Sequence, residues 1–198
     1  MTPRVLITGF EPFGDRAVNP SQLIVEALAG EHDVALLPVA YARAADTLRA
    51  ALAATQPDVV ICFGQADGRS GISIERFAHN LDGAENIDND GATSAAPIDP
   101  DGPVAYASTL PVDEIVAALR AEGIPAADSR DAGGFLCNHV FYALMRALDG
   151  STVRGGFVHV PLLPEQALDT NAPSMPLETL VRAARVIVAT CAAHSSGS

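Results

Sequence analysis

The chain contains three cysteines, and one of them, Cys137, has a setting that suits a nucleophile. It lies in GGFLCNHVFYALM, where apolar residues recur at helical spacing, so the pattern predicts a helix over residues 136–148 with Cys137 in its first turn. The positive end of a helix dipole lowers the pKa of a thiol, and backbone N–H groups there can hold a developing oxyanion. The alternative is a small buried hydrophobe, which is the commoner role of a lone cysteine in an apolar segment.

The other two cysteines are interpreted as packing residues. Cys62 lies inside the apolar run VVICFG, where a strand would bury it. Cys191 lies near the end of the last apolar helix and is expected to pack there or to contact another subunit.

A cysteine nucleophile needs a base, and the chain has five histidines. The strongest candidate is His159 in FVHVPLLPEQ, because the end of a strand can present a base to a neighbouring loop. His139 follows Cys137 by two residues, and on a helix this spacing turns the two side chains roughly 200° apart. The remaining three are expected at a turn, in a polar arm and at the terminus. A buried, hydrogen-bonded histidine is the alternative for His159.

A third group should fix the orientation of the imidazole, and Glu75 is the candidate. It is a charged residue in GISIERFAHN, an otherwise apolar, alternating segment that predicts a strand over residues 72–78. On such a strand Glu75 shares a face with Ser73 and Phe77. The alternative is an ion pair with Arg76 or with another arginine.

The elements that must position these residues follow an alternating pattern. Predicted strands cover residues 4–8, 34–39, 58–63, 72–78, 126–128 and 156–160. Predicted helices begin at Asn19-Pro20 and cover 42–55, 111–121, 136–148 and 176–193. This alternation predicts a single α/β domain over residues 1–198, an α/β/α sandwich with a mostly parallel, twisted sheet. Residues 82–102 read as a polar arm.

In open α/β sheets, sites lie at the carboxyl ends of the strands. Four loops rich in Gly or Pro follow predicted strands or precede the cysteine helix: residues 9–19, 64–71, 133–137 and 160–166. We therefore expect these loops to carry the functional residues.

Charge and motif content exclude several classes of function. The chain carries 24 acidic and 12 basic residues, a net charge of −12, which would repel nucleic acid and anionic membranes. No CxxC or HExxH spacing indicates a metal site. The apolar stretch near the N-terminus is too short for a signal peptide or a membrane span. A cytoplasmic protein without metal is the simplest interpretation.

Four segments together resemble the type I pyroglutamyl peptidases, also called pyrrolidone-carboxylate peptidases. TGFEPFG with NPS resembles the N-terminal signature of that family, GQADGRSGISIERFAHN the segment with its glutamate, SRDAGGFLCN the one with its cysteine, and GGFVHVPLLPEQ the one with its histidine. The segments stand in the family's order and at about its spacing, so the resemblance covers nearly the whole chain.

The resemblance implies a cysteine exopeptidase of phosphorylase/hydrolase-like fold that removes N-terminal pyroglutamyl residues from peptides without a cofactor. It implies Cys137 as nucleophile, His159 as base and Glu75 as the orienting residue. The residues implied to line or support the pocket are Phe10, Phe13, Asn19, Gln65 and Phe135. We also expect Phe135 or Leu136 to close one side of it. It also implies a homo-oligomer, a dimer or tetramer, in which the helix VRAARVIVATCAA could form a contact, although that helix could equally belong to the core.

The chain departs from the family pattern at three positions. Asp67 stands where the family usually has Gly, in a surface loop where the change is expected to be harmless. Glu85 and Asn86 replace the Arg-Ile of the family's arm, and we expect the added negative charge to weaken activity. Two alternatives therefore stay open: a related cysteine hydrolase of another cyclic amide or N-terminal group, and a weakly active homologue that binds pyroglutamyl peptides.

Overall fold

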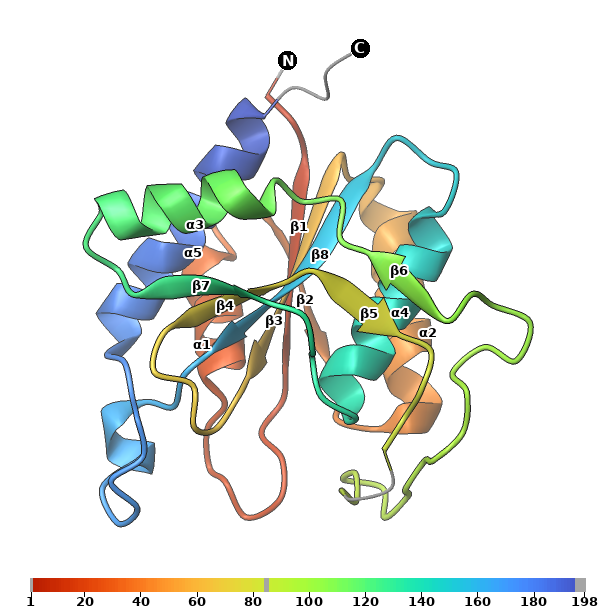
Figure 1. The fold of residues 1–198 in the computed structure, drawn as a ribbon, viewed down its shortest axis with the longest axis horizontal. Coiled ribbons are helices and arrows are strands. Elements are labelled where there is room, and N and C mark those ends of the chain that lie inside the picture. Colours follow the sequence, from red (N-terminus) through yellow and green to blue (C-terminus); the bar gives the residue numbers. More distant parts are fainter. Residues whose placement is uncertain (1, 84–85, 195–198) are drawn as a thin grey trace.

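A twisted sheet runs through the middle of the molecule, between two layers of helices (Figure 1). The computed structural model describes residues 2–83 and 86–194. Its six main strands lie in the order β2-β1-β3-β8-β4-β7. Their bounds are β1 Val5–Phe10, β2 Asp33–Leu37, β3 Val59–Gln65, β4 Ile72–Glu75, β7 Ala126–Ser129 and β8 Arg154–Val160.

All neighbouring pairs in this sheet are parallel except β4 with β8, which pair antiparallel through Ser73–His159 and Ile74–Val158. The sheet is therefore mostly parallel, and the predicted α/β fold class is confirmed. The one antiparallel pairing matters for the site, because it sets the carboxyl end of β4 against the inner part of β8.

Helices cover both faces of the sheet (Figure 1). One layer holds α1 (Pro20–Leu28), α3 (Val112–Ala121) and α5 (Leu177–Ala193), and the other holds α2 (Tyr41–Thr55) and α4 (Leu136–Leu148). Asn19 begins α1 as its cap, since its side chain accepts a hydrogen bond from the Ser21 N–H, and Pro20 suits the first helical position. Within the described residues, no helix combines the length and the hydrophobicity that a membrane crossing requires.

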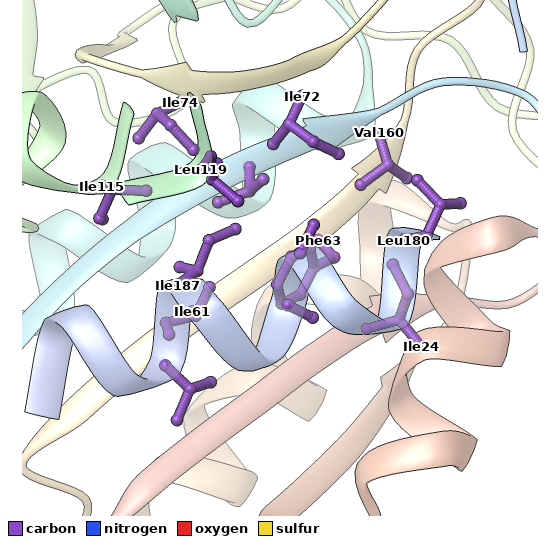
Figure 2. Close-up of a cluster of buried hydrophobic side chains, with 14 of the residues drawn as sticks. Ile24, Ile61, Phe63, Ile72, Ile74, Ile115, Leu119, Val160, Leu180 and Ile187 are labelled. Atoms are coloured by element: carbon purple, nitrogen blue, oxygen red, sulfur yellow. The ribbon is translucent and has the colours of Figure 1, made fainter. Parts of the chain in front are cut away.

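The core has two parts, one on each face of the sheet. Figure 2 shows the part under α1, α3 and α5, where Ile61, Phe63 and Ile187 meet between strand and helix. The part under α2 and α4 contains Cys62, Phe157 and Leu136, among others. Each fully buried aliphatic or aromatic side chain contributes roughly 1.5–3 kcal/mol, so these two clusters hold the strand ends in fixed positions.

The segment over residues 72–78 differs from the prediction. It is not one strand: β4 ends at Glu75, and Phe77–His79 forms β5, which pairs with β6 (Ala105–Ala107) in a separate two-stranded sheet. Arg76 lies at the break and reaches outward to Asp113 and Asp128. Ser73 and Glu75 still share a face, as predicted, whereas Phe77 belongs to the second sheet. A short 3₁₀ helix, η1 (Pro164–Gln166), follows β8.

The sheet order creates a divergence between two loops. The chain passes from β1 outward to β2 and then returns to place β3 on the other side of β1. The loops after β1 and β3 therefore leave in different directions, which is where α/β sheets form binding crevices.

Candidate active site

Cys137 is the second residue of α4 and is half-buried at the carboxyl edge of the sheet. Its sulfur lies over Gly64 in β3, because a Cβ atom added at Gly64 would stand only 2.8 Å from Cys137 Sγ. A residue with a side chain at position 64 would occupy that space. Gly64 thus allows the thiol to approach the backbone of the central strands.

His159 occupies the neighbouring position on the next strand. In the parallel register of β3 and β8, Gly64 is the partner of His159, so the two residues share a face of the sheet. The imidazole is buried and lies beside the Phe157 ring, with 4.9 Å between ring centroids. The structure therefore brings Cys137 and His159 to adjacent positions on β3 and β8.

Glu75 completes this arrangement from the far side of β8. Its Oε1 lies 2.8 Å from His159 Nδ1, and both side chains are almost fully buried. A carboxylate accepts a hydrogen bond from Nδ1–H, so this contact leaves Nε2 as the nitrogen available for proton transfer. The antiparallel pairing of β4 with β8 produces this contact, since it places Glu75 on the same face as Ser73 and His159.

The other proposed role for Glu75 is also present. Arg69 Nη2 lies 3.5 Å from Glu75 Oε1, whereas Arg76, the neighbour in sequence, pairs with Asp113 and Asp128 instead. The hydrogen bond to His159 and the ion pair with Arg69 therefore coexist on one carboxylate.

His139 takes a different direction from Cys137. Its Nδ1 lies 3.0 Å from Asp82 Oδ2, and its ring stands edge-on to Tyr41 with centroids 5.3 Å apart. His139 thus binds the beginning of the arm, which agrees with the opposed helix faces expected from the sequence.

The predicted lowering of the Cys137 pKa is wrong for the resting site. Burial raises the pKa of this thiol from 9.0 to about 12, with further increases from the Glu75 carboxylate and from Cys62. Hydrogen bonding to its own backbone amide acts in the opposite direction but is the smaller effect. Burial therefore disfavours the thiolate in the resting site, so a base is needed to remove the thiol proton.

The first turn of α4 supplies backbone donors near this thiol. Phe135 is the N-cap residue and forms no side-chain hydrogen bond to the helix. The first N–H groups of a helix have no acceptor within the helix itself, so those of Leu136, Cys137 and Asn138 are suited to bind an oxyanion.

A small cavity of about 290 Å³, counting the part open to solvent, lies next to Cys137. Its walls contain Cys137, Val39 and all six residues expected at the pocket: Phe10, Phe13, Asn19, Gln65, Phe135 and Leu136. Sequence reasoning missed Val39. Its position just beyond the carboxyl end of β2, beside β1, is the signal that could have indicated it.

Aromatic rings form much of the cavity wall, and the polar side chains of Asn19 and Gln65 hold the surrounding loops in place. The rings of Phe13 and Phe135 lie 6.1 Å apart. Asn19 uses its side chain to cap α1 and to donate to the Glu11 carbonyl, so it holds the loop in place. Gln65 accepts a hydrogen bond from Gln166 in η1, which joins the loops after β3 and β8.

Asp67 contributes more than its surface position suggested. Its Oδ1 accepts a hydrogen bond of 2.9 Å from Gln65 Nε2, and its other oxygen pairs with Arg16. Asp67 therefore connects the Gln65 amide to the loop that carries Phe13.

The arm borders the same loop. Asn89 donates to the Pro12 carbonyl at 2.9 Å and accepts from the Gly14 N–H, and Asp88 accepts from the Tyr41 N–H at 2.8 Å. Glu85 lies outside the described residues, and Asn86 is exposed. No cluster of three or more His, Cys, Asp or Glu side chains that could hold a metal ion occurs in the described part of the chain.

Comparison with known proteins gives a consistent result over the full length. The sequence profile described as pyroglutamyl peptidase matches residues 3–194. A pyrrolidone-carboxylate peptidase of Bacillus licheniformis is 45% identical, with 98% of this chain and 94% of the relative covered. One of Streptomyces coelicolor is 46% identical over 96% of this chain and 92% of its own length.

Solved structures agree. The crystal structure of pyroglutamyl peptidase I from Bacillus amyloliquefaciens superposes with a TM-score of 0.94 at 42% identity, covering 97% of this chain and 98% of that one. A mutant pyrrolidone carboxyl peptidase from Pyrococcus furiosus gives a TM-score of 0.89 at 40% identity, covering 95% and 97%. By sequence and by structure, this chain belongs to the pyroglutamyl peptidase family of cysteine peptidases.

Proposed function

We propose that this enzyme hydrolyses the bond after an N-terminal pyroglutamyl residue, with Cys137 as nucleophile, His159 as general base and acid, and Glu75 as the orienting carboxylate. The main support is the buried hydrogen bond of 2.8 Å between His159 Nδ1 and Glu75 Oε1. His159 is paired with Gly64 across β8 and β3, and the Cys137 sulfur lies over Gly64. N-terminally pyroglutamylated peptides are the proposed substrates, as the names of the relatives suggest.

The first half of the reaction forms a thioester. His159 Nε2 removes the thiol proton while Cys137 Sγ attacks the pyroglutamyl carbonyl carbon. Because burial raises the pKa of Cys137, removal of its proton by His159 assists the attack. The carbonyl oxygen becomes an oxyanion held by N–H groups of the first turn of α4. The C–N bond then breaks, and the amine of the shortened peptide leaves with the proton from His159.

The second half returns the enzyme to its starting state. His159 removes a proton from water, and the resulting nucleophile attacks the thioester carbon. The C–S bond breaks, pyroglutamic acid leaves, and the sulfur recovers its proton from the imidazolium. No cofactor is required for either half.

The cavity supports the substrate class. Pyroglutamate is small, cyclic and uncharged at its ring, and it fits a small cavity walled by phenylalanine rings with few polar groups. Its lactam carries one N–H and one C=O, whereas the ring of an N-terminal proline lacks the C=O and carries a charged amine. A free N-terminal glutamate would bring two charges into this apolar space. Both are therefore expected to be rejected.

A chromogenic assay tests the proposal. The parent enzyme should release the chromophore from a pyroglutamyl amide and leave the matching prolyl amide intact. Cys137→Ser should lose essentially all turnover, because a hydroxyl is a far weaker nucleophile than a thiol beside a base. Cys191→Ala, the matched control, removes a buried cysteine on the opposite face of the sheet and should retain turnover.

Alkylation identifies the reacting thiol independently. Iodoacetamide should modify Cys137 ahead of the two buried cysteines, and pyroglutamate present during the reaction should slow that modification. Modification of Cys191 alone with full activity retained would contradict the assignment of Cys137.

A further inference from the structure

The carboxylate of Glu75 is buried in an unusual way. Its side chain has no exposed surface, and Oε1 is the atom that contacts His159. Among the described residues, none donates a hydrogen bond to Oε2, which is also buried. Burying a carboxylate with an unsatisfied oxygen is costly unless a positive charge lies near it.

Arg69 supplies the positive charge. Its Nη2 lies 3.5 Å from Glu75 Oε1, and the arginine side chain is 35% exposed while the carboxylate is fully buried. An arginine stays charged under all conditions in which the enzyme folds. The guanidinium therefore lies between the buried carboxylate and solvent.

The same guanidinium joins the segments that carry the site. Nη1 donates to Ser73 Oγ at 3.3 Å, and Nη2 donates to the Asp131 carbonyl at 3.1 Å. Ser73 lies on β4 with Glu75, and Asp131 lies in the loop between β7 and α4 that leads to Cys137. Arg69 itself belongs to the loop after β3. One side chain thus connects the Glu75 strand to the loop before the cysteine helix.

We propose that Arg69 is a positioning residue for catalysis, which holds the buried Glu75 carboxylate in line with His159 and fixes the approach of the Cys137 helix. The proposal rests on the proposed function for its kinetic consequences. Arg69 is not among the residues that line the cavity, so we infer that it acts through Glu75 and through the loop at Asp131.

Arg76 provides a matched control. It follows Glu75 directly and also pairs with carboxylates, those of Asp113 and Asp128, but both lie toward solvent and away from His159. Removing its charge tests the general effect of losing an arginine from this part of the sheet.

The experiment compares Arg69→Gln, Arg69→Lys and Arg76→Gln by pH profiles of kcat and KM for a pyroglutamyl amide. Arg69→Gln should lower kcat roughly 10- to 100-fold with KM within about threefold, because the arginine acts on the proton-transfer group rather than on substrate. The acidic limb of its pH profile should move upward, because the positive charge that faces the buried Glu75–His159 pair is lost. Arg76→Gln should match the parent.

Arg69→Lys separates charge from geometry. Lysine keeps the positive charge but cannot form the two-armed contacts of a guanidinium. We expect a smaller loss of kcat than in Arg69→Gln, with the acidic limb near that of the parent. If Arg69→Gln does not fold, the test depends on Arg69→Lys. A lowered kcat with the acidic limb of the pH profile unchanged supports the proposal, and a kcat equal to that of the parent overturns it.

An Arg69→Gln enzyme that is less stable yet keeps the parental kcat and limb would show a purely structural role and overturn the proposal. The alkylation rate of Cys137 needs no substrate, so it tests the role of Arg69 even if the proposed function is wrong. If the parent does not cleave pyroglutamyl amides, the pH dependence of Cys137 alkylation by iodoacetamide still reports the coupling between thiol, imidazole and Glu75. An identical alkylation profile in the parent and in Arg69→Gln would overturn the role of Arg69 whatever the substrate is.

Discussion

Replacing Gly64 with alanine is the most direct test of how the thiol is placed. A Cβ atom at this position would lie 2.8 Å from Cys137 Sγ and 2.7 Å from Phe157 Cζ. Gly64 has no positive φ that would strain an alanine, so the effect of the methyl group is steric alone. Either the sulfur or the ring must move.

The ring has little freedom to do so. Phe157 packs between Phe10 and Phe141, with centroid distances of 6.4 and 5.9 Å, and it also lies against His159. The sulfur would have to move from 2.8 Å to the 3.4 Å at which ordinary van der Waals contact begins, a shift of about 0.6 Å. A misplacement of about 1 Å in a reacting group costs roughly 100-fold in rate, so we expect Gly64→Ala to lower kcat by about 10- to 100-fold.

Stability should fall as well, because the added methyl overfills a packed region. Overpacking costs about 1–3 kcal/mol, which for a chain of this size lowers Tm by roughly 3–10 °C. The assay is steady-state hydrolysis of a pyroglutamyl amide below the unfolding transition, with the alkylation rate of Cys137 and a thermal melt measured on the same sample.

Two other glycines serve as controls. A methyl at Gly30 meets nothing within 4 Å, so Gly30→Ala should keep both Tm and kcat. A methyl at Gly156 would lie 2.7 Å from Leu110 Cδ1, in the core part under α3 and α5, so Gly156→Ala should lower Tm while sparing kcat. If Gly64→Ala has the kcat and alkylation rate of the parent, or if Gly156→Ala loses as much activity, the placement of the sulfur over Gly64 does not control the reaction.

Two further predictions follow from the other titrating groups. His139→Ala removes the partner of the buried Asp82 carboxylate and should lower the free energy of unfolding by about 1–3 kcal/mol in denaturant titrations. The kcat of the folded enzyme should stay within about threefold of that of the parent. Loss of activity in a fully folded variant would contradict the placement of His139 and Cys137 on opposed faces of the helix. Burial raises the pKa of Cys62 and Cys191 from 9.0 to about 12, so their thiols ionise more readily in the unfolded chain, and stability should be lost as the pH rises from about 9 toward 12. A Cys62→Ala/Cys191→Ala variant should show a shallower loss than the parent, and equal slopes would refute this account.

Periodicity was enough to predict most of the helices and strands, because each buries one apolar face. Periodicity failed where the pairing of strands, rather than the pattern of apolar residues, decides the structure. The strand predicted over residues 72–78 runs through Arg76, yet the chain changes sheets at this residue, whose side chain pairs with Asp113 and Asp128. The short strand Ala105–Ala107 has no apolar repeat and exists only through its pairing with Phe77–His79.

The site shows the same division between local and distant effects. The place of Cys137 at the start of a helix could be predicted from neighbouring residues. Its raised pKa could not, because burial and the Glu75 carboxylate come from segments far away in the sequence. The sequence left open whether Arg76 or another arginine pairs with Glu75, because which arginine reaches a carboxylate depends on the turn after β3 that carries Arg69.

The position of β8 in the sheet has a consequence for the order of folding during synthesis. β3 and β4 are not neighbours, and β8 lies between them. Until residues 154–160 have left the ribosome, the strands already made can form only two separate groups, β2-β1-β3 and β4-β7. The edges of β3 and β4 stay unpaired in that interval, which makes it the stage most exposed to wrong pairing. His159 arrives on the same strand that joins the two groups, so the chain acquires its base and closes its sheet in a single, late event.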